Sequence, residues 1–162
     1  MQFRHYLQPL VMPESVALVG ASERPGSLGR IVFENLLAGG FKGEIIAVNP
    51  KHRSILGHRP VRSLAALPKP VDLAVIAIPC DQVVETLRQG GSAGLTAAAI
   101  LTTRPVGVAA ARQWERDVAA AAALHRIRFV GPESYGVIRT DLGLNASVGG
   151  VQPISGRLAL IA

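Results

Sequence analysis

The chain has 162 residues, of which 49% are hydrophobic and 4% aromatic, and its formal net charge is +6. This length suits one well-cored domain and is too short for two of ordinary size. No uncharged apolar run approaches the roughly 20 residues that cross a membrane, and residues 1–6 lack the apolar core of a secretion signal. The single cysteine, Cys80, excludes an internal disulfide, so we expect a cytoplasmic protein.

The net positive charge raises nucleic acid as a partner, because a basic surface attracts polyanions. However, the basic residues are scattered along the chain without a block of five or six. The aromatic residues are also too few to form a platform on which bases stack. We therefore do not expect nucleic acid, whereas a small phosphorylated ligand would use the same positive field.

The first predicted unit is a strand, a glycine-rich turn and a helix. An apolar run over residues 16–20 ends at Gly20, and apolar residues recur at the helical period from Leu28 to about Ala38. Free backbone N–H groups at such a helix start can hold a phosphate. The glycine spacing, G-x5-G-x2-G, differs from the G-x-G-x-x-G of dinucleotide binders. A tight turn that needs glycine only for steric reasons remains the alternative.

Strands and helices alternate along the rest of the chain. Strands are predicted at residues 44–48, 71–78, 96–101 and 128–130. Helical segments are predicted at about 63–67, from Cys80 onward, and from about 106 to 125, with Trp114 in the core. This alternation predicts an α/β fold: one Rossmann-like domain with a mainly parallel sheet and helices on both faces.

The ends of the chain are expected to be less regular. Residues 1–14 are predicted as a lead-in and 15–150 as the domain, with loops at 144–147 and 149–150. Residues 157–162 have the composition of a strand that is just beginning. We therefore expect residues 151–162 to start a following domain.

Ligands of an open parallel sheet bind beyond the carboxyl ends of its strands. The loops that converge there are expected at residues 20–29, 49–51, 78–80, 102–104 and 131–136. A dinucleotide site would carry an acid at the end of the second strand, to bind the ribose. Asn49, Pro50 and Lys51 stand there instead. Lys51 favours an additional phosphate, which argues against NAD.

Four motifs occur in an order and at spacings that resemble one family. They are Gly20-Ala21-Ser22 with Pro25 and Gly29, Val48-Asn49-Pro50-Lys51, Leu67-Pro68 followed by the run from Val71 to Pro79, and Gly131-Pro132-x-Ser134-x-Gly136. Together they resemble the CoA-binding domain of the NDP-forming acyl-CoA synthetases, which are related to the α-subunit of succinyl-CoA synthetase. The resemblance covers about residues 8–162. The same domain begins a group of bacterial protein lysine acetyltransferases that end in a GNAT domain.

The resemblance implies that the chain binds CoA or an acyl-CoA, with acetyl-CoA as the expected thioester. It places the CoA phosphates and ribose at Ser22, Glu23, Arg24, Gly26 and Gly29, and one phosphate at Lys51 beside Asn49. It places the pantetheine arm beside Ile78, Pro79 and Cys80, and the thiol end at Thr102 and Thr103. It implies further domains of a parent chain and allows an oligomer. No catalytic residue or metal ligand is expected here, because the synthetases phosphorylate a histidine in their next domain. His5, His52, His58 and His125 do not match its motif.

The chain departs from the family pattern at the thiol end. Glu133 replaces an asparagine in the Gly131–Gly136 turn, and residues 102–107 replace a S-G-F-x-E stretch. These departures favour a parent in which ligase activity has decayed, as in the acetyltransferase branch, over an active ligase. A redox-sensing module that binds NAD(H) is the alternative from another class, and Asn49 argues against it.

Plainer interpretations of single residues also remain open. Arg24 and Lys51 are then ordinary solvated charges. Cys80 begins a helix, where the thiol pKa falls, so a mixed disulfide with CoA is one interpretation and a small buried residue on the helix face is the other.

Overall fold

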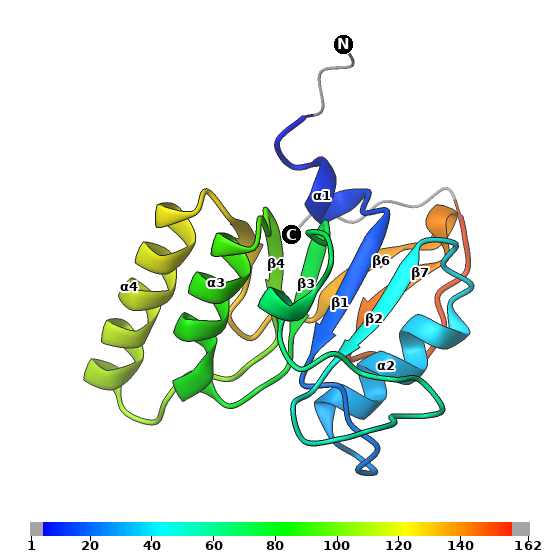
Figure 1. Ribbon diagram of the computed structural model, residues 1–162, viewed down its shortest axis with the longest axis horizontal. Helices are drawn as coiled ribbons and strands as arrows, with labels where there is room; N and C mark the ends of the chain where they lie inside the picture. Colours follow the sequence, from blue (N-terminus) through cyan, green and yellow to red (C-terminus); the bar gives the residue numbers. More distant parts are fainter. Residues whose placement is uncertain (1–4, 157–162) are drawn as a thin grey trace.

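A five-stranded parallel sheet forms the centre of the computed structural model, which describes residues 5–156 (Figure 1). The strand order is β2-β1-β3-β4-β5. Their bounds are β1 Ser15–Val19, β2 Glu44–Val48, β3 Leu73–Ile76, β4 Ala97–Ile100 and β5 Arg128–Val130. Every residue of β1, β3 and β4 is buried, as expected of parallel strands covered on both faces. The predicted Rossmann-like α/β fold is thus confirmed.

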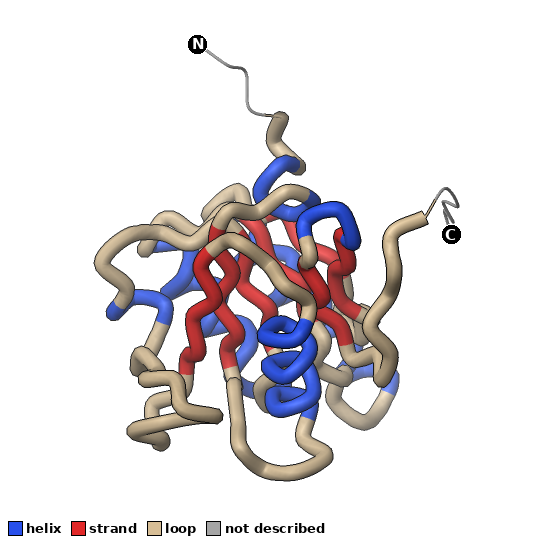
Figure 2. The backbone as a smooth tube through the Cα atoms, turned by 90° about the vertical axis from the view of Figure 1, so that its right-hand side faces the viewer, coloured by secondary structure: helices blue, strands red, loops and turns tan. Residues whose placement is uncertain are grey.

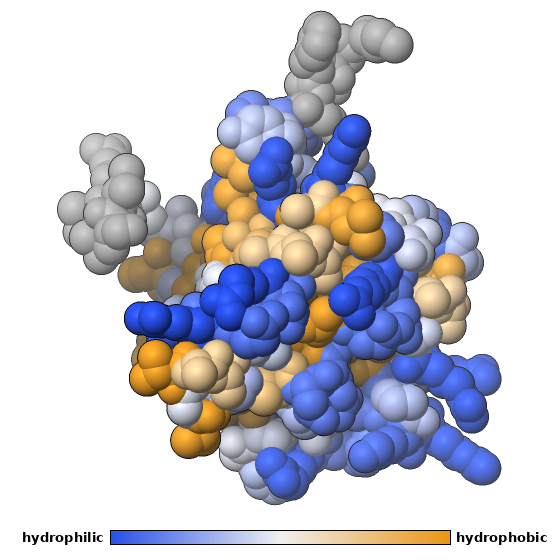
Figure 3. Space-filling view, turned by 90° about the vertical axis from the view of Figure 1, so that its left-hand side faces the viewer, coloured by the Kyte–Doolittle hydropathy of each residue, from blue (hydrophilic) through white to orange (hydrophobic). Residues whose placement is uncertain are grey.

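One face of the sheet is covered by two helices, α3 Val83–Ser92 and α4 Val108–Leu124. The 3-10 turns η1 Leu64–Ala66 and η2 Cys80–Gln82 complete this layer. Trp114 is buried in its core, and its indole Nε1 donates a hydrogen bond to the carbonyl of Cys80 at 2.7 Å. The outer surface of this layer carries hydrophilic side chains interspersed with smaller apolar areas (Figure 3), as is usual for surface helices.

The other face is covered by helix α2, Leu28–Ala38, together with a β-hairpin and the short helix α1, Gln8–Val11. Figure 2 shows α2 lying in front of the strands on this side. The hairpin pairs β6 Gly136–Arg139 with β7 Leu144–Ser147 in antiparallel register, and the turn η3 Thr140–Leu142 joins them. The sheet therefore separates two cores, one lined by α3 and α4 and the other by α2 and the hairpin.

The expectation of a loop at residues 144–147 is wrong, because this segment is the fully buried strand β7. Leu144 and Ala146 pack into the α2-side core. The polar residues between them are also buried, and Ser147 Oγ donates to Asn145 Oδ1 at 2.7 Å. Asn35 of α2 donates from Nδ2 to the carbonyls of Ser147 and Gly149 at 2.9 and 2.7 Å. Because the buried polar side chains of β7 are hydrogen-bonded, this core strand can contain residues that are typical of loops.

The segment before β1 packs against the domain. The predicted lead-in contains α1, whose Leu10 is buried in the α2-side core. The expectation that residues 157–162 begin a strand lies outside the described residues. Within residues 5–156, no helix combines the length and apolar character that crossing a membrane requires.

Candidate functional site

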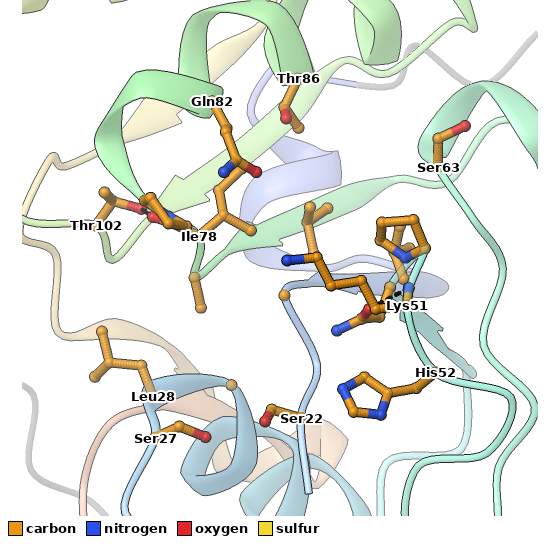
Figure 4. Close-up of a pocket in the computed structure, with 18 of the residues that line it drawn as sticks. Ser22, Ser27, Leu28, Lys51, His52, Ser63, Ile78, Gln82, Thr86 and Thr102 are labelled. Carbon is orange, nitrogen blue, oxygen red and sulfur yellow. Dashed lines mark hydrogen bonds between the residues drawn. The ribbon is translucent and has the colours of Figure 1, made fainter. Parts of the chain in front are cut away.

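A cleft of about 930 Å³ opens where the loops after β1, β2, β3 and β4 meet (Figure 4). The strand order reverses between β1 and β3, so the chain leaves these neighbouring strands toward opposite faces of the sheet. Such a switch point leaves a crevice at the carboxyl edge, where ligands of open α/β sheets bind. The volume is within the range of cofactor pockets.

The loop between β1 and α2 forms the floor of the cleft and depends on two close backbone approaches. Gly20 has φ +92°, and a Cβ there would overlap the carbonyl of Ala77 in the loop after β3. Gly29 lies in the first turn of α2, and a Cβ there would overlap the carbonyl of Gly20. Ser27 caps the helix by accepting a hydrogen bond from the N–H of Arg30. The start of α2 is thereby held against the cleft, where its free N–H groups suit an anion.

The charged side chains around the cleft are all basic. Among the described residues that line it are Arg24, Lys51 and Arg62, together with His52, whereas none is an aspartate or a glutamate. Lys51 and His52 lie on one side of the cleft in Figure 4, and Ile78 and Thr102 lie on the other. The cleft therefore combines a basic side with an uncharged side.

Asn49 joins the two loops that carry the basic side chains. Its Nδ2 donates to the carbonyl of Ala21 at 2.9 Å, and its Oδ1 accepts from the N–H of Lys51 at 2.8 Å. A carboxylate at this position has no proton for the Ala21 carbonyl. The amide is therefore the side chain that fits both partners, and it holds Lys51 next to the β1–α2 loop.

The loop after β3 supplies apolar residues to the uncharged side of the cleft. Ile78, Pro79 and Cys80 line it, together with Leu28 from the start of α2. Thr102 is only 4% exposed, and its Oγ1 donates to the carbonyl of Ile78 at 2.8 Å. Its hydroxyl thus supports the β3 loop, while Thr103 is exposed at the rim.

Ten of the twelve residues expected in the site line this cleft. They are Ser22, Arg24, Gly29, Asn49, Lys51, Ile78, Pro79, Cys80, Thr102 and Thr103. The cleft lining does not include the other two. Glu23 directs its carboxylate to the N–H of Leu56, and Gly26 lies exposed in the turn before α2 with φ +74°.

Further lining residues escaped the sequence analysis. Arg62 and Ser63 reach the cleft because Val61 pairs with the edge of β2, accepting from the N–H of Asn49 and donating to the carbonyl of Ala47, each at 2.9 Å. Three polar residues at the start of and along α3 also line it: Gln82, Thr86 and Gln89. Their i, i+4, i+7 spacing places them on one helix face, so the sequence pattern could have predicted that they face the same way.

An exposed ion-pair cluster lies beyond the rim, where the chain departs from the family pattern. Arg104 donates from Nη2 to Glu133 Oε2 at 2.8 Å and from Nη1 to Glu115 Oε1 at 3.0 Å. The hydrogen bonds from Arg104 hold the pKa of the Glu133 carboxyl below its ordinary 4.5, and Glu133 in turn raises the pKa of Arg104. Glu133 thus bonds with the loop after β4 and not within its own turn.

Replacing Arg104 by glutamine should raise the pKa of Glu133 toward 4.5, because the guanidinium bond that favours the ionised form is lost. Because the folded-state pKa is lowered, the pair stabilises the fold above the ordinary pKa, and this contribution is lost as the pH falls through the lowered value. An NMR titration of the Glu133 side chain in both proteins measures the shift. An unchanged midpoint would show that Arg104 does not act on Glu133 in solution.

Comparison with known proteins identifies the family. The model of the CoA binding domain matches residues 14–140, which include all five strands of the sheet and the cleft. The chain belongs to the CoA-binding domain family. This bears out the family resemblance described above.

Within this family the chain is similar to part of several longer enzymes. It is 32% identical over 158 residues to ADP-forming acetate–CoA ligase I of Archaeoglobus fulgidus, covering 96% of this chain and 23% of that protein. It is also 32% identical to the α-subunit of ADP-forming acetate–CoA ligase I of Pyrococcus furiosus, covering 96% of this chain and 35% of the subunit. The chain thus spans about a quarter to a third of these curated relatives.

Solved structures show the same relationship. The acetyl-coenzyme A synthetase 1 of Candidatus Korarchaeum cryptofilum, solved with phosphate and ADP, superposes with a TM-score of 0.82 at 31% identity. The match covers 88% of this chain and 31% of that one. PH0766 from Pyrococcus horikoshii gives a TM-score of 0.81 at 32% identity, over 88% of this chain and 33% of that one. The CoA-binding domain family therefore accounts for the fold and not only for single motifs.

Proposed function

We propose that this chain binds CoA or an acyl-CoA in the cleft between β1 and β3. The observation that carries the proposal is the division of the cleft into a basic side and an uncharged side of apolar and neutral polar residues. CoA has the matching chemistry, since three phosphates lie around its adenosine and a neutral pantetheine arm leads to the thiol. The family and its ligase relatives support the same ligand.

The twelve expected site residues divide between these two ends of CoA. Ser22, Arg24 and the start of α2 at Gly29 would hold phosphate oxygens, and Lys51 would pair with one phosphate while Asn49 positions it. Ile78, Pro79 and Cys80 would run beside the pantetheine arm, with Thr102 and Thr103 near the thiol. Glu23 and Gly26 would shape the phosphate loop from outside the cleft.

We further propose that the chain serves as the CoA-binding module of an ADP-forming acyl-CoA ligase. The two curated relatives named above are ligases and the Korarchaeum structure is a synthetase, which favours this parent over a lysine acetyltransferase. Acetate is the acid in the names of the two curated relatives described, which favours acetyl-CoA as the thioester. The departures at Arg104 and Glu133 form an ion pair of 2.8 Å, and neither residue lines the cleft, so they leave the proposed CoA site unchanged.

Isothermal titration of the chain with CoA, acetyl-CoA and NADH tests the proposal. We expect a dissociation constant in the micromolar range for CoA and acetyl-CoA, corresponding to about −8 kcal/mol, and no binding of NADH. Binding of NADH without binding of CoA would replace the proposal by the redox-sensing alternative. No heat with any of the three ligands would contradict CoA binding by this chain.

A further inference from the structure

Glu23 lies between two cleft residues but points away from the cleft. Ser22 and Arg24 line the cleft on either side of it, and the N–H of Arg24 donates to Ser22 Oγ at 3.0 Å. The Glu23 carboxylate instead accepts a hydrogen bond at 2.7 Å from the backbone N–H of Leu56, 33 residues further along the chain. This bond connects the loop after β1 to the loop after β2.

Leu56 occupies the tip of a tight turn that is well anchored. Ile55 and His58 exchange two backbone hydrogen bonds of 2.8 and 2.9 Å, and Leu56 and Gly57 both have positive φ, +47° and +81°. This is the geometry of a two-residue hairpin turn. Ile55 is fully buried in the α2-side core, and the His58 ring packs edge-on against Phe33 at 5.4 Å between centroids.

This turn belongs to the segment that supplies the basic side of the cleft. Residues 51–62 contain Lys51, His52 and Arg62 of the cleft lining and no acidic residue. Two hydrogen bonds connect this part of the chain to the β1–α2 loop: Asn49, two residues before the segment, donates to the Ala21 carbonyl, and Leu56 within it donates to Glu23. The two bonds lie on either side of Lys51 and His52 along the chain.

We propose that Glu23 is a positioning residue that holds the 51–62 segment against the β1–α2 loop, so that the basic side of the cleft is formed before CoA arrives. This inference rests on the proposed CoA-binding function. A negative charge beside phosphates opposes their binding, and the carboxylate is engaged by the Leu56 N–H outside the cleft lining, so contact with a CoA phosphate does not explain an acid at this position. An acceptor oxygen for the Leu56 N–H does explain it.

The proposal predicts different CoA affinities for two substitutions of Glu23. Glu23→Gln keeps an acceptor oxygen and removes the charge, so CoA affinity should stay equal or increase slightly. Glu23→Ala removes the acceptor, and if only about a tenth of the molecules then keep the segment in place, the affinity should fall roughly tenfold. Asp117→Ala, on the exposed side of α4, is the matched control for loss of an acidic side chain and should leave the affinity unchanged.

Titration with CoA and amide hydrogen exchange at Leu56, measured by NMR on the ligand-free chain, test this together. We expect faster exchange at Leu56 in Glu23→Ala and protection close to that of the unsubstituted chain in Glu23→Gln. Equal weakening by both substitutions would overturn the proposal, because it would show that the carboxylate itself meets the ligand. Unchanged exchange in Glu23→Ala would overturn it as well. If the unsubstituted chain does not bind CoA, the proposed function fails. The exchange rates at Leu56 then still show whether Glu23 holds the turn in the ligand-free chain.

Discussion

Replacing Lys51 by alanine should weaken CoA binding by roughly 10- to 100-fold. Lys51 is exposed in the cleft, and Asn49 holds its backbone next to the β1–α2 loop. A hydrogen bond to a charged group contributes about 1.5–3 kcal/mol, which corresponds to this range of affinity. Because the side chain is exposed, the fold should keep its stability. Titration calorimetry with CoA measures the change.

Lys42→Ala is the matched control for this substitution. Lys42 is exposed between α2 and β2 and does not line the cleft, so its loss changes the net charge equally without removing a contact. Its affinity for CoA should remain close to that of the unsubstituted chain. If the two alanine variants bind CoA equally well, Lys51 acts only through the general positive field and does not contact a phosphate.

Replacing Gly29 by alanine should destabilise the domain by about 3 kcal/mol, at the upper end of the cost of overpacking. Alanine normally favours a helix over glycine, so propensity alone predicts the opposite sign. At this position the added Cβ would overlap the carbonyl of Gly20, and α2 would have to move away from the β1 loop. Thermal unfolding should show a midpoint lower by roughly 10 °C.

Gly150→Ala provides the control for this prediction. A Cβ at Gly150 meets no atom within 4 Å, so its unfolding midpoint should not change. If the unfolding midpoint of Gly29→Ala is also unchanged, α2 does not pack against Gly20 as described. Because the start of α2 also borders the cleft, a folded Gly29→Ala protein should bind CoA more weakly than the Gly150→Ala protein.

The five strands and three longer helices could be predicted because each has a strong local pattern. The strands are short apolar runs, four of which end near glycine, proline or asparagine and one, β4, near two threonines, and α2 repeats apolar residues at the helical period. The hairpin could not be predicted in the same way. Asn145 and Ser147 satisfy each other inside the core, so the pattern of β7 contains polar residues where a core strand normally has apolar ones.

The site was predictable where it follows directly from strand ends. The residues after β1, β2, β3 and β4 meet at one edge in any parallel sheet, which accounts for the ten expected residues that line the cleft. Arg62 depends instead on the pairing of Val61 with β2, and the direction of Glu23 depends on the turn at Leu56. Both contacts join segments that are distant in sequence and have no local pattern.

The hairpin on the α2 side has a consequence for how the chain folds during synthesis. Asn35 bonds with carbonyls more than 110 residues later, and Leu144 and Ala146 complete the core that contains Phe33. A nascent chain that has just released β5 from the ribosome still exposes that apolar surface. Such contacts between distant residues slow folding and leave apolar surface open to aggregation. We therefore expect the α2-side core to stay incomplete until residues 136–147 emerge and cover it.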